Sequence, residues 1–232
     1  MTVVIAQPEN LPWLGYFDKM RHSDIFVFLD NVQFKRRYFE NRNKIRTRDG
    51  WIWLTIPVIV KGKFEQKINE VMIDNTRDWR RKHWNSFVHA YQRAPHFKDY
   101  ADFFEHTYKQ DWQFLVDFNI RLCLFIAEAM SLKQEFKRAS ELKIGGRSTE
   151  LLLNICRKLN ARTYFSGKFG KNYLDESRFA EHNIGIVYQD FRHPTYNQLF
   201  KPFIPGMSAV DLLFNYGRMS REILENRGTA IS

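Results

Sequence analysis

The stretch TVVIAQPENLPWLGYFDKMRHSDIFVFLD, residues 2–30, determines the fold class of this chain. It opens with a β-branched apolar run at 2–6, and after a polar loop it carries apolar residues at helical spacing from Trp13 to Met20. A second continuous apolar run follows at 25–30. Strand, loop, helix and strand in this order predict a βαβ unit with parallel strands and a right-handed crossover. Runs that are apolar at every position indicate a sheet covered on both faces.

The rest of the chain predicts more strands around a helical middle. We expect further strands at 51–60, 68–74, 162–166 and 184–191, whereas residues 76–160 have helical periodicity. The predicted fold is α/β: a mostly parallel sheet flanked by helices, in the layout of nucleotide-binding folds. We predict a single α/β domain over 1–232, with a helical lobe at 76–160 inserted between the two sheet-forming halves. The last residues of the sequence, ENRGTAIS at 225–232, are predicted to form a frayed tail.

Composition limits the classes of partner and compartment. The 36 Lys and Arg residues against 26 Asp and Glu residues give a net charge of +10, which favours anionic partners. No run approaches the apolar length of a membrane span, and the first residues lack the pattern of a signal peptide, so we expect a cytoplasmic protein. Cys123 and Cys156 lie in apolar helical patterns and predict buried free thiols rather than a zinc site. We therefore expect no metal and no permanently bound cofactor.

Polar clusters follow four of the predicted strands. Because ligands bind beyond the carboxyl ends of parallel strands, neighbouring strands would bring these clusters together at one edge of the sheet. The residues that would converge are Gln7, Asp30, Gln33, Gly167, Lys168, Tyr173 and His193.

Two basic segments, the loop 166–173 and the segment 35–48, suggest binding of an anionic partner. The loop SGKFGKNY, 166–173, combines two glycines with Lys168 and Lys171 before a predicted helix, which favours phosphate or carboxylate; the alternative is an ordinary turn. The segment KRRYFENRNKIRTR, 35–48, and the tryptophans that follow it mix basic and aromatic residues, as surfaces for nucleic acid or a nucleotide base do. Its alternative is a solvated loop.

His193, in FRHPTYNQ at 191–198, is the predicted chemical group. The following proline biases it toward an extended backbone, and Tyr196 and Gln198 follow at alternating positions. Asp190 or Asp211 would orient the ring, and a neutral imidazole is a suitable general base near pH 7. The alternative is a turn histidine bonded to the backbone.

Two blocks of the sequence resemble a known family. QPENLPWLGYFDKMRHSDIFVFLDNVQFKRRYFENRNKI, 7–45, resembles the opening of the WbqC-like protein family, and 164–217, from YFSGKFGKNYLDE to DLLFNYG, resembles its closing block. The sequence departs from the family pattern at Ala6, Glu9 and Asn10, where the family has a histidine before Gln-Pro and an Asn-Tyr pair after it. If the histidine of the family has a functional role, that role would be absent in this chain, which has Ala6 at the position, or another group would supply it.

The resemblance implies an acyl- or aminoacyltransferase of bacterial surface-polysaccharide biosynthesis. Such an enzyme forms an amide on an amino sugar, here expected to be nucleotide-linked. The acyl donor would be a thioester on an acyl carrier protein, whose acidic surface suits a basic enzyme.

This reading assigns roles to the candidate residues. His193 would be the base, oriented by Asp211 or Asp190. The sugar or the oxyanion would be bound by Gln7, Gln33, Asn41 or Asn43. Phosphates would be held by Lys168, Lys171 and Arg42. Asp30, Gly167, Tyr173, Tyr196 and Gln198 complete the predicted binding set. Two alternatives remain: a nucleotidyltransferase-like enzyme, which the absence of a His-x-Gly-His signature disfavours, and a non-catalytic module that binds nucleic acid or a carrier protein. Nucleic acid is the less favoured partner, and the sequence does not predict the oligomeric state.

Overall fold

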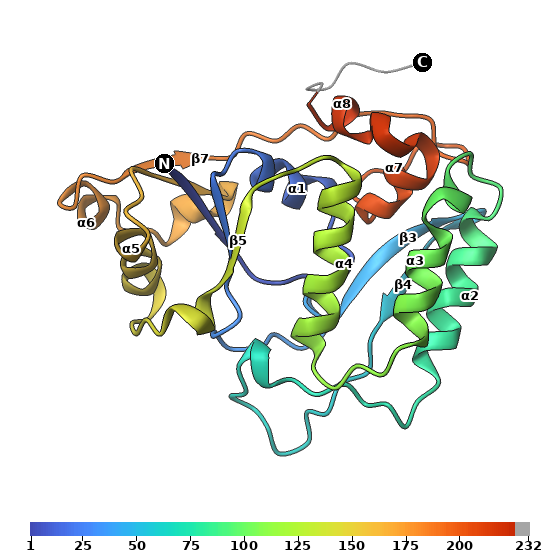
Figure 1. Cartoon of the computed structure of the whole chain (residues 1–232), viewed down its shortest axis with the longest axis horizontal. Coiled ribbons are helices and arrows are strands. Elements are labelled where there is room, and N and C mark those ends of the chain that lie inside the picture. The colour runs from blue at the N-terminus through green and yellow to red at the C-terminus, as the bar shows by residue number, and fades with distance from the viewer. Residues whose placement is uncertain (226–232) are drawn as a thin grey trace.

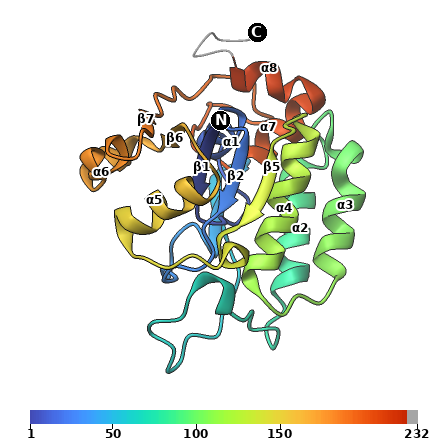
Figure 2. The same ribbon diagram turned by 60° about the vertical axis from the view of Figure 1, so that its left-hand side comes forward.

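The core of the molecule is a sheet of five parallel strands. The computed structural model describes residues 1–225, so residues 226–232 of the predicted tail lie outside it. The strand order is β5-β2-β1-β6-β7, and every neighbouring pair is parallel, as the sequence predicts. The strands, visible in Figures 1 and 2, are β1 (Thr2–Ala6), β2 (Ile25–Phe28), β5 (Glu135–Arg138), β6 (Thr163–Ser166) and β7 (Gly185–Tyr188).

Helices cover both faces of this sheet. Their bounds are α1 (Leu14–Arg21), α2 (Trp79–Tyr91), α3 (Phe97–Lys109), α4 (Leu115–Ala129), α5 (Ser148–Lys158), α6 (Glu176–Ala180), α7 (Ala209–Tyr216) and α8 (Ser220–Glu225). The short 3₁₀ turns are η1 (Ile68–Glu70), η2 (Ala139–Leu142), η3 (Lys168–Asn172) and η4 (Gly217–Met219). Figure 2 shows α5 on one side of the sheet and α4 on the other.

Alternating side chains of β1 and β2 divide the core into two layers. Val4 and Phe26 pack in the larger layer, with α1, α4 and α7. Val3 and Ile25 pack in the smaller layer, with α5. Since successive side chains of a strand point to opposite faces, strands that are apolar throughout require this double cover.

A separate antiparallel hairpin replaces the predicted third strand. β3 (Arg42–Thr47) pairs with β4 (Gly50–Thr55) in a two-stranded sheet of its own, which lies beside α2 and outside the central sheet (Figure 1). The strand predicted at 51–60 is therefore too long and in the wrong sheet. The prediction at 68–74 is also wrong, because the segment forms η1 and isolated bridges. β3 was overlooked because charged residues alternate along it.

The helical insertion is shorter than predicted. Helices α2, α3 and α4 lie between the hairpin and β5, as the helical middle predicts. However, β5 pairs with β2, and α5 packs on the central sheet, although both fall within the predicted lobe at 76–160. No helix among residues 1–225 has the length and apolar character needed to cross a bilayer.

Candidate functional site

The loops after β1 and β6 meet at the middle of the carboxyl edge of the sheet. From β1 the chain moves to β2 on one side, and it later returns to β6 on the other side of β1. The direction of strand order thus reverses between β1 and β6, and open α/β sheets bind ligands at this kind of switch point. The sequence prediction that these strands are parallel neighbours is confirmed.

Glu9 and Lys19 bring opposite charges to the switch point. Glu9 lies in the loop after β1, and Lys19 lies on α1. The Lys19 side chain reaches the loop after β6, where its Nζ is 3.9 Å from the position that a Cβ atom of residue 167 would take. A Cβ atom at residue 167 would therefore be in ordinary van der Waals contact with the end of the Lys19 side chain. Beneath it, the Tyr16 hydroxyl donates a hydrogen bond to the Gln7 carbonyl.

Burial shifts both of these charged groups toward their neutral forms. It raises the pKa of Glu9 from 4.5 to about 7; the ammonium of Lys19 opposes this shift and the carboxylate of Glu40 adds to it. The pKa of Lys19 is lowered by burial, while Glu9 and Asp18 act in the opposite direction. Near neutral pH, Glu9 therefore exists as both acid and carboxylate, which suits a group that exchanges protons.

Unpartnered polar side chains gather beside Glu9. Asn10, Glu40 and Asn119 are completely buried. Asn119, on α4, donates its Nδ2 to the carbonyls of Pro8 (3.1 Å) and Glu40 (2.7 Å), and so joins the two loops. Its Oδ1, both amide atoms of Asn10, both carboxylate oxygens of Glu40 and Oε2 of Glu9 find no hydrogen-bond partner among the described residues.

These atoms favour a ligand that donates hydrogen bonds. All of them except the amide nitrogen of Asn10 are acceptors. Buried polar groups are normally satisfied, and exceptions often belong to sites whose partner is a ligand or water. Burial raises the pKa of Glu40; the backbone N–H groups of Glu40 and Lys35 and the Lys35 ammonium partly offset the effect, although neither N–H reaches hydrogen-bonding geometry with the carboxylate. The cluster therefore suits hydroxyl groups and an amine.

Several predicted binding residues instead hold the local structure. Asp30 is buried, and its carboxylate accepts hydrogen bonds from the backbone N–H and the hydroxyl of Ser140. Gln33 donates to the carbonyl of Phe64. Asn43 donates to the carbonyl of Leu11 and accepts the N–H of Lys44. The side-chain atoms involved are already occupied, so a binding role for these three remains a prediction that the geometry does not favour.

Asn41 and Arg42 retain free hydrogen-bonding capacity. Asn41 donates to the Ile56 carbonyl, and its Oδ1 has no partner in the described chain. The guanidinium of Arg42 lies 4.4 Å above the Trp53 ring, and its buried Nε is also unpartnered there. Both residues follow Glu40 directly and remain candidates for ligand binding.

The loop after β6 is accessible and basic. Lys168 and Lys171 are exposed on η3, and the Lys171 ammonium lies 5.1 Å from the centre of the Tyr188 ring. Tyr173 is 56% exposed, and its carbonyl accepts the hydroxyl of Thr149. This loop, which begins at Gly167, is free to meet an anion at the switch point.

His193 is held by backbone groups on both sides of its ring. Its Nε2 accepts the N–H of Gly206 at 3.2 Å, so its Nδ1 carries the proton and donates to the Pro194 carbonyl at 2.8 Å. Burial lowers the pKa of His193, which keeps the ring neutral. This is the turn-histidine alternative of the sequence analysis, and the geometry favours it over the role of general base.

Neither predicted carboxylate orients His193. Asp211 is buried and accepts hydrogen bonds from the Tyr196 hydroxyl and from Nε2 of Gln198, each at 2.8 Å. Asp190 is exposed, and within residues 1–225 no hydrogen bond joins it to the ring. The predicted pairing with either aspartate is therefore wrong.

Tyr196 and Gln198 belong to a buried structural network. Gln198 also accepts from Nε of Arg46, whose guanidinium donates to the carbonyls of Thr47, Gly50, Phe200 and Pro202. The network ties the loop before α7 to the hairpin. The network gives the polar side chains of Tyr196 and Gln198 a structural role that needs no bound substrate.

The described residues contain no metal-binding cluster and two buried cysteines. Burial raises the pKa of Cys123 well above its usual range and that of Cys156 to about 12, so both thiols are protonated. Within residues 1–225, no group of three or more His, Cys, Asp or Glu side chains is placed to hold a metal ion.

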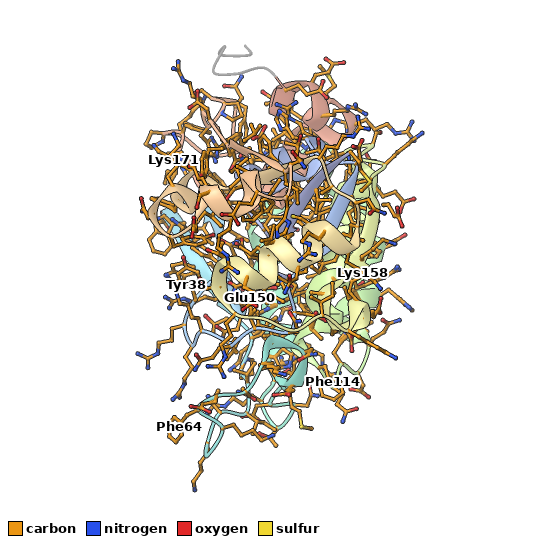
Figure 3. All side chains as sticks on the ribbon, turned by 90° about the vertical axis from the view of Figure 1, so that its left-hand side faces the viewer. Tyr38, Phe64, Phe114, Glu150, Lys158 and Lys171 are labelled. Carbon is orange, nitrogen blue, oxygen red and sulfur yellow. The ribbon has the colours of Figure 1, made fainter. Side chains whose placement is uncertain are left out.

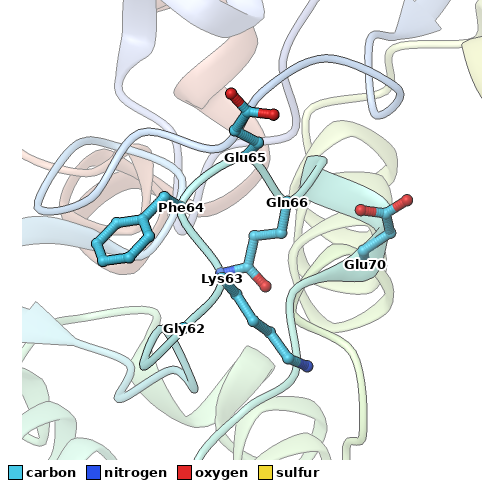
Figure 4. A pocket seen from close by; sticks show the side chains of 6 residues that line it. All are labelled: Gly62, Lys63, Phe64, Glu65, Gln66 and Glu70. Carbon is cyan, nitrogen blue, oxygen red and sulfur yellow. The ribbon is translucent and has the colours of Figure 1, made fainter.

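Two surface hollows lie outside the group of polar side chains beside Glu9. One, of about 650 Å³, is an open depression in the loop between β4 and η1 (Figure 4), lined by Gly62, Lys63, Phe64, Glu65, Gln66 and Glu70. Its loop is hydrogen-bonded to the loop after β2, and Oε1 of Gln66 is also without a partner among the described residues. The other, of about 380 Å³, lies where α3 meets η4 and includes Asp99 and Arg218. Because Glu9 and Lys19 meet at the switch point and neither hollow includes them, we place the candidate site there.

Sequence reasoning missed Lys19, Glu40 and Asn119 as site residues. Lys19 lies within the apolar pattern of 14–20. Because a lysine is rarely placed between buried positions, its occurrence there is the sequence signal that could have marked it as a site residue. Glu9 and Asn10 were noted only as departures from a family pattern. The burial of Glu40 depends on the path of the 35–40 loop, which no local pattern reveals.

Comparisons with known proteins identify two similarities. The model of the WbqC-like protein family matches residues 7–223. A protein of Mycobacterium tuberculosis (strain ATCC 25618 / H37Rv), described as "Uncharacterized protein Rv1507c", is 35% identical over 224 residues, which cover 96% of each chain. No solved structure matches.

Proposed function

The chain belongs to the WbqC-like protein family, and from this premise we propose that it is an N-acyltransferase that forms an amide on an amino sugar. We further propose that the sugar is nucleotide-linked and that the reaction serves surface-polysaccharide biosynthesis in the cytoplasm. The observation that supports the chemistry best is Glu9, a carboxyl with a pKa of about 7 at the switch point of a parallel sheet.

Glu9 is the proposed general base. An amino sugar binds as its ammonium form, and Glu9 takes a proton from it to give the nucleophilic amine. The amine nitrogen then attacks the carbonyl carbon of an acyl thioester. The new C–N bond forms, the C–S bond breaks, and the thiolate leaves with the proton that the nitrogen loses. Amide and free thiol are the products, and Glu9 releases the proton it has taken to solvent before the next turnover.

Lys19 is the proposed stabiliser of negative charge. Lys19 is half-buried, its ammonium reaches the loop after β6, and it interacts electrostatically with Glu9 in the loop after β1. A positive charge fixed in a water-poor site stabilises the oxyanion that develops on the thioester carbonyl. Asn10, Asn119 and Glu40 would then accept hydrogen bonds from the sugar hydroxyls and the amine, which matches their excess of free acceptors.

The loop after β6 is the proposed phosphate site. Gly167 permits close backbone approach, and Lys168 and Lys171 add exposed positive charge. Arg42 and Asn41 are proposed to contact the same substrate from β3. A nucleotidyltransferase reaction is the second candidate, because the same switch point and basic loop are what a nucleoside triphosphate needs.

A direct assay separates these candidates. The protein is incubated with a uridine-diphosphate-linked 4-amino sugar and one donor at a time: an acylated carrier protein, an acyl-coenzyme A, or an amino acid with ATP. Mass spectrometry then measures the acylated sugar nucleotide. We expect Glu9→Gln to lower the rate by about 10²–10⁴, the usual contribution of a general base. Glu181→Gln, at an exposed position, should leave the rate unchanged.

Three results would contradict the assignment. Full turnover in Glu9→Gln with loss in His193→Ala would return the base role to His193. Pyrophosphate release from a nucleoside triphosphate without amide formation would favour the nucleotidyltransferase. Absence of product with every donor and sugar would remove the acyltransferase proposal.

A further inference from the structure

The outer face of the β3–β4 hairpin combines exposed aromatic rings with cations. Residues directly opposite in the hairpin, such as Lys44 and Trp53, share one face, as do their neighbours two positions along each strand. Arg46 belongs to this face as well, but the loop that carries Phe200 and Pro202 covers it. Ile45 and Leu54 point the other way and are buried in the core. We call the outward set, with the preceding loop, the aromatic-basic face: Lys35, Tyr38, Phe39, Arg42, Lys44, Trp51 and Trp53.

The rings of this face form one continuous strip. Phe39 contacts Tyr38 on one side and Trp53 on the other, with ring centres 5.1 and 6.3 Å apart, and Trp53 contacts Trp51 at 5.7 Å. Tyr38, Trp51 and Trp53 are 46%, 43% and 37% exposed. Exposed aromatic rings that adjoin one another are typical of protein interfaces and unusual on a surface without a partner.

Cations lie on the faces of these rings. Arg42 lies over Trp53 at 4.4 Å, Lys44 over Trp51 at 5.0 Å, and Lys35 over Tyr38 at 5.0 Å. No Lys or Arg from 35 to 48 forms an ion pair with another described residue. The face is therefore positively charged, partly preorganised and without an acidic partner of its own.

The position of the cations distinguishes between two kinds of anionic partner. Single-stranded nucleic acid binds by stacking its bases on free ring faces. Here Arg42 covers Trp53 and Lys44 covers Trp51, so a base would have to displace a cation before it could stack. A protein surface rich in carboxylates can pair with the cations where they are and pack apolar side chains against the ring edges.

We propose that the aromatic-basic face docks an acidic partner protein, the carrier that delivers the acyl thioester. This inference rests on the proposed acyltransferase function for the identity of the partner. The face adjoins the candidate site, because the backbone N–H of Asn10 donates to the carbonyl of Phe39 at 2.9 Å. A carrier docked on the hairpin would thus bring its thioester to the same side of the molecule as the unpartnered polar groups.

Binding measurements with two single variants test the face. The probe is a holo acyl carrier protein with a strongly acidic surface, and affinity is measured by calorimetry at low and high salt. Lys44→Glu and Trp51→Ala should each weaken binding by roughly tenfold, as central charged and aromatic interface residues commonly do. Lys158→Glu makes the same charge change at an exposed position at the end of α5, away from Tyr38 (Figure 3), and should change the affinity by less than about twofold.

A single-stranded oligonucleotide is the competing probe. The docking proposal expects carrier binding that responds to both variants and oligonucleotide binding that is weaker. No carrier binding, or equal weakening by Lys158→Glu, would overturn it. Tight oligonucleotide binding that is lost in both variants, without carrier binding, would assign the face to nucleic acid instead.

Turnover separates the docking proposal from the proposed function. With a small thioester donor such as an acyl-N-acetylcysteamine, Lys44→Glu and Trp51→Ala should form amide at the unaltered rate. Carrier binding that depends on the face without any amide product would retain the docking surface and reject the acyltransferase. If both variants form amide from the acylated carrier at the wild-type rate, the acyltransferase function would be retained and the docking surface rejected.

Discussion

Arg46 is completely buried and Glu9 is half-buried with its Oε2 inside the protein, but their surroundings give these two charged side chains different uses. The guanidinium of Arg46 donates to four backbone carbonyls and to Gln198, so its hydrogen-bonding capacity is filled by the protein. Glu9 has an unpartnered oxygen and a pKa of about 7. Arg46 therefore fixes structure, whereas Glu9 is available to exchange a proton with a ligand.

The pH dependence of turnover should report Glu9. The carboxylate is the form that accepts a proton, and it predominates above the pKa. We expect kcat/KM to rise with pH through about 7 and the rise to be absent in Glu9→Gln. Initial rates from pH 5 to 9 measure this, and a wild-type profile that is flat between pH 6 and 8 would argue against Glu9 as the base.

The same substitution should stabilise the folded protein at high pH. Because the folded-state pKa of Glu9 is raised, the folded state holds its proton longer than the unfolded state, and stability falls as pH rises from 4.5 to about 7. Glu9→Gln removes this loss, so we expect a gain of about 1–3 kcal/mol at pH 8 and little change at pH 4. The variant also loses the attraction between the Glu9 carboxylate and the Lys19 ammonium, and this loss limits the gain in stability. Urea unfolding at both pH values would measure the difference.

Asp211→Ala should destabilise the protein without acting through His193. The carboxylate accepts two buried hydrogen bonds, from Tyr196 and Gln198, and alanine would leave both donors unpaired in the core. We expect a loss of about 1–3 kcal/mol in the free energy of unfolding. Asp190→Ala, at an exposed position, is the matched control and should stay within about 0.5 kcal/mol. Equal effects of the two changes would contradict this account.

The elements that meet at the switch point depend on α1. Its first turn accommodates the indole of Trp13, which lies against Gly15 and also contacts Phe191 at 5.4 Å between ring centres. The backbone of Trp13 pairs with that of Ser208, just before α7. The start of α1 thus fixes the loop after β1, which carries Glu9, relative to the C-terminal helices.

Gly15→Ala tests this packing. Alanine favours a helix over glycine by about 1 kcal/mol, but its Cβ would stand 2.3 Å from the Trp13 ring. Overpacking of this kind costs about 1–3 kcal/mol, so the clash should win and the variant should be less stable. Gly145→Ala, where a Cβ meets nothing within 4 Å, should have little effect. Denaturant unfolding of both variants checks the sign.

Local pattern was sufficient for some elements and insufficient for others. β1, α1 and β2 were predicted because their apolar residues have unambiguous spacing and both faces of the sheet are covered. β5 was missed because its sequence, EFKR, carries charge at an edge of the sheet. In the site, the convergence of strand ends follows from topology, whereas the burial of Glu9 depends on contacts with Lys19 and Glu40 that lie distant in sequence.

At the scale of the molecule, the last third of the chain completes what the first residues begin. β6 pairs with β1, and α7 fills the larger layer of the core with Val210, Leu212 and Phe214, all completely buried. The two ends of the sequence are therefore parts of one cooperative structure.

A chain that stops at residue 160 should not fold. It lacks β6 and α7, so β1 keeps an open edge and the larger layer loses a whole helix. We expect no cooperative thermal transition and binding of hydrophobic dyes, whereas a chain that stops at Glu225 should unfold in a single transition. A sharp transition in the shorter chain would show that the N-terminal part is an independent domain.

The central position of β1 also has a consequence for translation. β1 leaves the ribosome before both of its neighbours, and β2 follows at Ile25, but the other neighbour begins only at Thr163. At an elongation rate of about 5–20 residues per second, one apolar edge of β1 stays unpaired for roughly 10–30 s. During that interval it presents a template on which strands of other nascent chains can pair. Yield in cells should therefore depend on chaperones that shield the emerging β1, more than on the stability of the finished fold.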